Sequence, residues 1–147
     1  MSKIAEVERL LEQSMRDRDQ QRIDTLRLVL SALRRKEKDL SRPLTETEEL
    51  QILQRECKQR IEAGEAFSKA GREVQAANEA AELLIIETLM PQRLSEEELA
   101  ELVDRTIGAT GATSIADLGQ VMAVLMPEVT GRADGGTVSQ LVRERLS

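Results

Sequence analysis

The residues best suited to binding a ligand lie in a glycine-rich loop near the end of the chain, from Thr130 to Thr137. The loop contains five residues of interest for binding, namely Gly131, Arg132, Asp134, Gly135 and Gly136. A helix is predicted to start directly after it. Unpaired amides at a helix start, together with the positive end of the helix dipole, favour phosphate or carboxylate groups. With an arginine beside these amides, the loop is a candidate anion-binding site.

A second interpretation of the loop stays open, because Asp134 is a good helix N-cap. Its carboxylate would accept hydrogen bonds from the same amides that an external anion would use. The loop is not a P-loop, since no Gly-Lys-Ser/Thr follows at the required spacing. It is not a dinucleotide fingerprint either, since no strand precedes it. A tight surface turn capped by its own aspartate therefore competes with a phosphate site.

A second group of candidate residues is a basic face on the helix predicted around residues 23–40. At 100° per residue its four cations fall within one sector beside the leucine stripe: Arg27, Arg34, Arg35 and Lys38. A solvated helix face is the usual explanation for such a pattern. If the face binds nucleic acid, recognition through backbone and shape is expected, because the chain has no Trp or Tyr and one Phe for base stacking.

The composition argues against most catalytic chemistry. The chain has no histidine, so the commonest general base and transition-metal ligand is missing. The single cysteine, Cys57, lies in an apolar stripe between Leu53 and Ile61, which favours a buried structural role. The consecutive acids at 96–98 point in different directions around a helix and are expected to favour its dipole. The sequence predicts no catalytic residue, no metal site and no cofactor.

Charge and hydropathy limit the partners. The 147-residue chain has a formal net charge of −6, so contact with a polyanion must be local. Residues 1–90 contain 16 basic and 18 acidic side chains, and residues 91–147 contain 5 and 9. No apolar run reaches the ~20 residues that a membrane span needs, and the N-terminus is too acidic for a signal peptide. A cytoplasmic protein without a membrane partner is expected.

Four helices are predicted in the first part of the chain. Ser2 caps the first, residues 16–19 form a turn, and the second ends near Pro43. Thr45 and Glu48 form a capping box at the start of the third. The apolar stripes are Ile4, Val7, Leu10, Leu11 and Met15; Ile23, Leu26, Leu30 and Leu33; Leu50, Leu53, Cys57 and Ile61, continuing toward Phe67; and Val74, Ala77, Ala81 and Leu84. Residues 83–89 are apolar nearly all round, which predicts burial or an interface.

Three short helices are predicted after Met90-Pro91. Ser95 and Glu98 form a capping box, Gly108 and Gly111 are expected to end the first of these helices, and Ser114 with Asp117 opens the next. Met126-Pro127 is expected to end that helix, and Asp134 to cap the last.

No segment alternates with period two, so an all-α fold is predicted. The expected architecture is an N-terminal bundle of long amphipathic helices over residues 1–91 followed by a small three-helix domain over residues 92–147.

Several motifs along the chain resemble the GatB/YqeY family. They are Asp24-Thr25-Leu26-Arg27-Leu28-Val29, Lys58-Gln59-Arg60-Ile61-Glu62, Glu65-Ala66-Phe67-Ser68-Lys69-Ala70-Gly71-Arg72, Leu89-Met90-Pro91-Gln92-Arg93-Leu94-Ser95-Glu96-Glu97-Glu98-Leu99, Gly119-Gln120-Val121-Met122, Met126-Pro127 and Gly131-Arg132-Ala133-Asp134-Gly135. The resemblance covers nearly the whole chain. It implies an N-terminal helical domain, a three-helix C-terminal domain and kinship with the tail of the B subunit of the glutamine-dependent aminoacyl-tRNA amidotransferase.

In that family the module is associated with tRNA binding. The resemblance therefore implies a non-catalytic, tRNA-associated accessory module, in which the loop and the basic face contact backbone phosphate. The carbon–nitrogen ligase activity with glutamine as amido donor belongs to the larger enzyme. The alternative is a protein-interaction module that docks on an aminoacyl-tRNA synthetase, an amidotransferase subunit or a second copy through residues 83–89. An independent enzyme is the third and weakest possibility.

Overall fold

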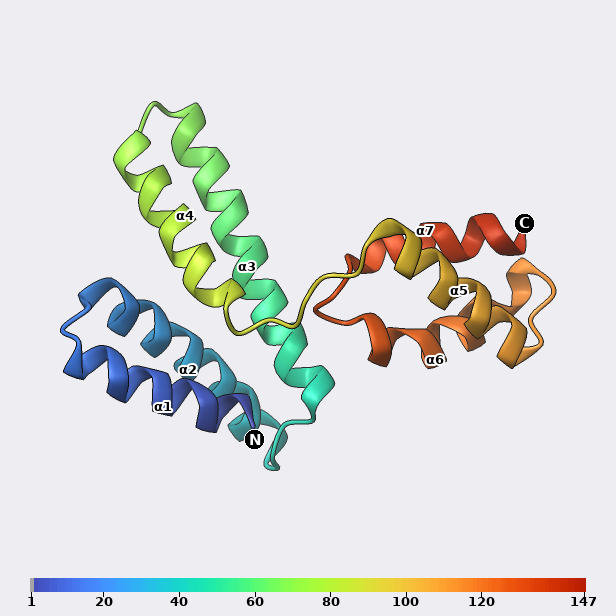
Figure 1. Ribbon diagram of the computed structural model, residues 1–147, viewed down its shortest axis with the longest axis horizontal. Coiled ribbons are helices and arrows are strands. Elements are labelled where there is room, and N and C mark those ends of the chain that lie inside the picture. The colour runs from blue at the N-terminus through green and yellow to red at the C-terminus, as the bar shows by residue number, and fades with distance from the viewer. Residues whose placement is uncertain (1) are drawn as a thin grey trace. The chain divides into compact units, whose positions relative to one another are not determined.

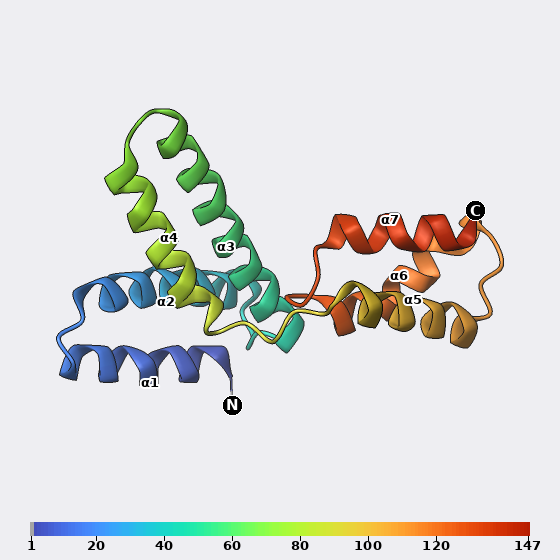
Figure 2. The same cartoon turned by 45° about the horizontal axis from the view of Figure 1, so that its top comes forward.

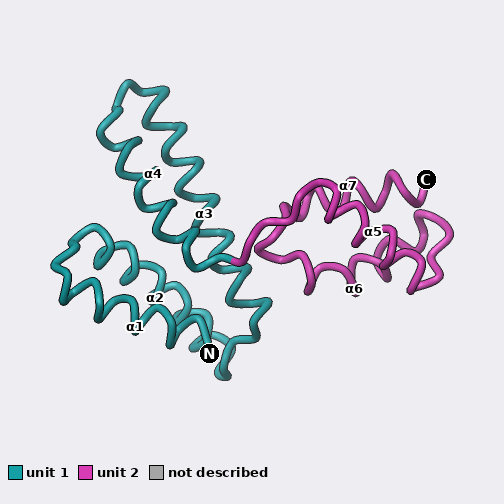
Figure 3. Tube along the Cα trace, viewed as in Figure 1, with its two compact units in different colours: residues 1–90 teal, residues 91–147 magenta. Residues whose placement is uncertain are grey.

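The computed structural model describes residues 2–147, and every regular element in that range is a helix (Figure 1). The predicted all-α fold is confirmed. Contacts between Cα atoms divide the chain into two compact units, residues 1–90 and 91–147 (Figure 3). Each unit has its own cluster of buried apolar side chains. That the units are separately folding domains stays a prediction.

Helices α1 (Lys3–Arg16) and α2 (Gln20–Leu40) lie side by side and antiparallel (Figures 1 and 2). The Ser2 hydroxyl accepts a hydrogen bond from the Ala5 amide at 3.2 Å, which confirms the predicted cap. Asp19 caps α2 in the same way through the Arg22 amide at 3.2 Å. The tight turn between them leaves α1 facing α2 along its length.

Helices α3 (Glu46–Lys69) and α4 (Glu73–Glu87) form a second hairpin. The capping box of Thr45 and Glu48 is present at the start of α3, as predicted. Gly71, with φ of 73°, takes the left-handed conformation that ends the helix. The two hairpins of this unit are also joined by a hydrogen bond of 2.7 Å from the Lys3 amide to the carboxylate of the buried Glu49.

The core of the first unit lies where α2 meets the base of the α3–α4 hairpin. Its buried members are Val7, Leu26, Val29, Leu33, Leu50, Leu53, Ile86 and Leu89. Several residues of the predicted apolar stripes lie outside it; among them, Ile61, Val74 and Leu84 are 48%, 73% and 67% exposed. Ile61 and Val74 lie farther along the hairpin than the core residues Leu53 and Ile86, whereas Leu84 lies near Ile86 but on an exposed side of α4. Met15, at the end of the first predicted stripe, is also exposed.

Ion pairs help to hold the α3–α4 hairpin together. Arg60, whose side chain is 10% exposed, binds Glu56 of its own helix at 2.7 Å and Glu82 of α4 at 3.1 Å. Glu79 lies 3.9 Å from the same guanidinium, and burial together with the neighbouring Glu82 raises the pKa of Glu79. One arginine therefore bridges carboxylates from both helices.

The second unit contains α5 (Glu96–Thr110), α6 (Leu118–Val129) and α7 (Gly135–Leu146), with a short 3₁₀ turn, η1 (Ile115–Asp117), before α6. The predicted capping box of Ser95 and Glu98 is present. The core is formed by Leu99, Val103, Val121, Leu125, Val129, Ala133, Val138, Val142 and Leu146. Arg145 of α7 also binds Asp104 of α5 at 2.9 Å.

Two predicted helix ends in this unit are wrong. Gly108 lies inside α5, and Gly111 alone ends it, with φ of 71°. Pro127 also lies inside α6, which continues to Val129. Because Pro127 has no amide hydrogen, the carbonyl of Ala123, an exposed residue, lacks its usual helical donor. Since Val129 is fully buried, core packing holds the last turn in place.

Within residues 2–147 the structure contains no helix with the length and apolar character that crossing a bilayer requires.

Candidate functional site

The four basic residues predicted to share one sector of α2 surround a single depression in the surface. The depression is open and has a volume of about 470 Å³. Its lining consists of Arg27, Leu30, Ser31, Arg34, Arg35 and Lys38. All of these residues come from α2, so the regular geometry of one helix fixes their relative positions. Lys38 lies 11 positions after Arg27, over which the helix rises about 16 Å, so the four cations of the basic face are spread along the helix axis.

The cations of this face differ in their ion-pairing. Arg34 binds the carboxylate of Glu8 on α1. Among residues 2–147, Arg27, Arg35 and Lys38 form no ion pair. All four side chains are exposed. Arg27, Arg35 and Lys38 can therefore bind an external anion without first breaking an ion pair with a carboxylate of the protein.

A second depression adjoins the basic face and shares Arg34 and Lys38 with it. Glu8 and Glu37 add carboxylates to its lining, and Arg42 and Pro43 lie at its edge. Its volume is about 610 Å³. The surface beside the basic face is therefore of mixed charge, with acidic groups where α1 meets α2.

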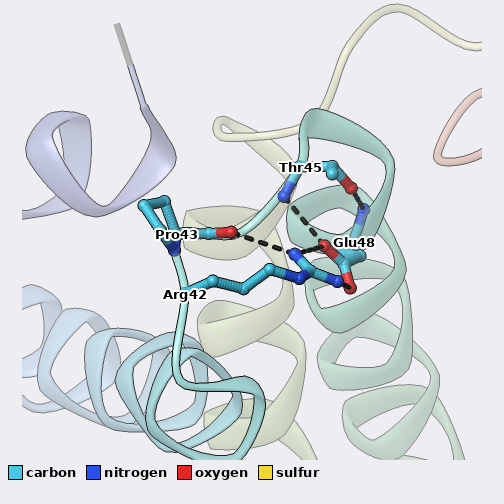
Figure 4. Close-up of polar contacts among 4 residues, drawn as sticks. All are labelled: Arg42, Pro43, Thr45 and Glu48. Carbon is cyan, nitrogen blue, oxygen red and sulfur yellow. Dashed lines mark hydrogen bonds and ion pairs between the residues drawn. The ribbon is translucent and has the colours of Figure 1, made fainter.

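Arg42 is already engaged by the start of α3 (Figure 4). Its guanidinium donates to both carboxylate oxygens of Glu48, at 2.8 and 3.0 Å, and to the carbonyl of Pro43 at 3.0 Å. The hydrogen bond from Arg42, followed by the one from the Thr45 amide, lowers the pKa of Glu48 to about 2. Arg42 is thus hydrogen-bonded to the capping box and is not part of the basic face.

In the glycine-rich loop, Asp134 acts as the N-cap of α7. Its carboxylate accepts from the Thr137 amide at 3.1 Å and from the Thr137 hydroxyl at 3.3 Å. The amides of Arg132 and Ala133 both donate to the carbonyl of Val129. Of the loop amides predicted to meet an anion, those of Gly135 and Gly136 have no acceptor among the residues that the structure describes.

Arg132 ties the loop to the segment before α5. Its Nε donates to the carbonyl of Gln92 at 3.1 Å, and its own carbonyl accepts from the Leu94 amide at 2.9 Å. Gly131, buried and with φ of 79°, makes the turn that brings Arg132 to this position. Arg132 therefore has a structural function within the second unit, whereas the basic face belongs to the first.

The other candidates of the sequence analysis take structural positions. Cys57 is half-buried and packs against the core cluster of the first unit. Glu98 accepts from the Ser95 amide at 3.0 Å, and its hydrogen bonds with Ser95 lower its pKa.

Glu8, Leu30 and Ser31 were not singled out from the sequence as site residues. Ser31 and Leu30 fall in the same helical sector as the four cations, so that sector could have included them. Glu8 could be found only by placing α1 against α2.

The family model described as Yqey-like protein matches residues 4–146, which is nearly the whole chain and includes both units. A search of curated proteins gives no match.

Proposed function

This chain belongs to the YqeY-like protein family, and on that premise we propose that it is an accessory module that binds the phosphate backbone of tRNA. The basic face of α2, defined as Arg27, Arg34, Arg35 and Lys38, is the main contact. No catalytic step is assigned to the chain.

The observation that carries the proposal is the gathering of these four cations around one open depression. Exposed arginine and lysine side chains can reach phosphate oxygens, and each contact releases condensed counterions, which drives binding. The net charge of −6 does not prevent this, because charges farther than about 8 Å away are largely screened at physiological salt.

Recognition through backbone and shape fits the composition. Proteins that bind unstructured single strands commonly stack bases on aromatic side chains. The single aromatic residue here, Phe67, lies near the end of α3 and not on the basic face. A folded RNA with paired regions is therefore a better partner for this surface than an unstructured strand.

The glycine-rich loop supports a weaker second contact. The amides of Gly135 and Gly136 at the start of α7 would favour an anion. The Asp134 carboxylate lies beside them, with Oδ2 only 3.2 Å from the position that a Cβ would take at Gly136, and would repel a phosphate. Arg132→Ala would also remove the bond to Gln92, so variants of α2 test the proposal more cleanly.

The test replaces the three unpaired cations together, as Arg27→Gln, Arg35→Gln and Lys38→Gln. Fluorescence anisotropy with deacylated total tRNA should show an affinity at least tenfold lower in low salt. The slope of log K against log salt should become shallower by about one for each phosphate that the variant no longer binds.

A matched control removes the same charge from the α3–α4 hairpin, as Arg55→Gln, Lys58→Gln and Lys69→Gln. These side chains are exposed and, among the described residues, form no ion pair. The control should retain most of the affinity. Equal reductions in both triple variants would mean that only net charge matters, and no binding by the unmodified protein would refute the proposal.

The alternative function is a protein-interaction module, and the apolar surface of the α3–α4 hairpin favours it. Of the predicted docking segment, residues 83–89, Ile86 and Leu89 are buried, but Leu84 is 67% exposed. Ile61 and Leu83 line a separate depression of about 360 Å³ on this hairpin. A dimeric mass by light scattering that becomes monomeric on Leu84→Ser would support self-association. Pull-down of a synthetase or amidotransferase subunit, abolished in the same variant, would support docking.

A further inference from the structure

Arg34 differs from the other cations of the basic face because a carboxylate from another helix already occupies it. Its partner, Glu8, comes from the antiparallel helix α1. Arg34 lines both the basic depression and the neighbouring mixed-charge depression, so it lies at the boundary between them. We propose that Glu8 masks Arg34 and so lowers the affinity of the basic face for a phosphate backbone. This inference rests on the proposed function.

The pair is too exposed to have an important structural role. The side chains of Arg34 and Glu8 are 57% and 47% exposed, and ion pairs at such positions stabilise a fold weakly. The contact between α1 and α2 instead depends on buried side chains such as Val7, Leu26 and Val29. Breaking the pair would therefore leave the hairpin folded.

The same ion pair lowers the affinity of Arg34 for an anionic ligand. A phosphate that takes the Nη2 donor of Arg34 must displace Glu8, and a phosphate at the other donors of the same guanidinium lies beside the Glu8 carboxylate, which repels it. Glu37 lines the same mixed-charge depression and adds a second negative charge on that side. Of the other two cations that line this depression, Arg42 is held by Glu48, and Lys38 forms no ion pair with Glu8 among the described residues. Glu8 thus opposes binding both by competing for Arg34 and by repelling the phosphate.

The experiment compares Glu8→Gln with a matched variant of the same helix, Glu12→Gln. Glu12 pairs with Arg16 at 3.6 Å, is also exposed and lines neither depression. Both changes remove one negative charge from α1. Binding to deacylated total tRNA should be about two- to fivefold tighter for Glu8→Gln, the range expected for an exposed ion pair, and nearly unchanged for Glu12→Gln.

A double-mutant cycle measures how much of the gain in affinity depends on the ion pair between Glu8 and Arg34. Arg34→Gln should weaken binding. Adding Glu8→Gln to it should bring a smaller gain than in the unmodified protein, because only the direct repulsion of the phosphate is then relieved. Circular dichroism melts should show that each variant keeps its helical fold.

The affinities of these variants support or refute masking of Arg34 by Glu8. Equal affinities for Glu8→Gln and Glu12→Gln, or a full gain in the Arg34→Gln background, would refute masking. The proposed function would still stand if the triple α2 variant loses affinity as expected. Absence of binding in every variant would refute both proposals.

Discussion

Thr25 shows how one buried polar group can reduce stability. It lies on α2 within the first motif of the family resemblance, is completely buried, and its hydroxyl has no partner among the described residues. A buried hydroxyl without a hydrogen bond costs about 1–3 kcal/mol. Thr25→Val removes the hydroxyl with little change of shape. We expect the free energy of unfolding to rise by about 1 kcal/mol in a urea titration.

Thr106 is the matched control for this substitution. It is also buried in a helix, but its hydroxyl donates to the Leu102 carbonyl at 2.8 Å. Thr106→Val therefore removes a satisfied group and should not stabilise the protein. Similar gains at both positions would show that the missing partner of Thr25 is not the cause.

The ion pair of Arg42 and Glu48 predicts a dependence of stability on acid pH. The pKa of Glu48 is lowered from 4.5 to about 2 in the folded protein, chiefly by its hydrogen bond from Arg42. In the unfolded chain this carboxyl takes up a proton at higher pH, so its stabilising contribution is complete above about pH 5 and decreases as the pH falls from 4.5 to 2. In the Arg42→Gln variant, the urea concentration at the midpoint of unfolding should decrease less steeply between pH 4.5 and 2 than in the unmodified protein. Arg55→Gln, at an exposed arginine without an ion pair in the described part of the chain, should leave the slope unchanged.

At the scale of elements, local sequence signals located most helix starts but not every helix end. The caps at Ser2, Thr45, Ser95 and Asp134 depend on bonds within three residues, so they could be predicted. Gly108 and Pro127 carry the same local signals as real helix ends. Their helices continue through them, and for Pro127 the reason is that Val129, farther along the same helix, is buried.

The two glycines of α5 provide a test of this distinction. Gly108 has helical geometry and open space where a Cβ would lie, so Gly108→Ala should stabilise the second unit by about 0.5–1 kcal/mol. Gly111 has φ of 71°, and Gly111→Ala should destabilise it by about 1 kcal/mol. Thermal or urea unfolding measures both changes. Effects of the same sign would contradict the assignment of Gly111 alone as the helix end.

At the scale of the whole molecule, each of the two units has a core of its own. The buried cluster of the second unit contains only residues from Leu99 to Leu146, and that of the first only residues from Val7 to Leu89. We therefore expect fragments 1–90 and 91–147 to fold separately, although units of this size bury modest cores. Each should show a helical circular dichroism spectrum and a cooperative melt. A fragment that unfolds alone, but is protected from amide exchange in the full chain, would show that the units depend on each other.

The order of the helices, their amphipathic faces and the basic face of α2 follow from the sequence alone, because 3.6-residue periodicity and capping act over a few residues. Only the tertiary structure decided which stripes become core. Ile61, Val74 and Leu84 have the same apolar character as Leu53 and Ile86, but their side chains remain exposed. The pairing of Glu8 with Arg34 likewise required two helices to be placed side by side, since 26 residues separate them. Local patterns thus determined the elements, and long-range packing determined which surfaces they bury and which charges they neutralise.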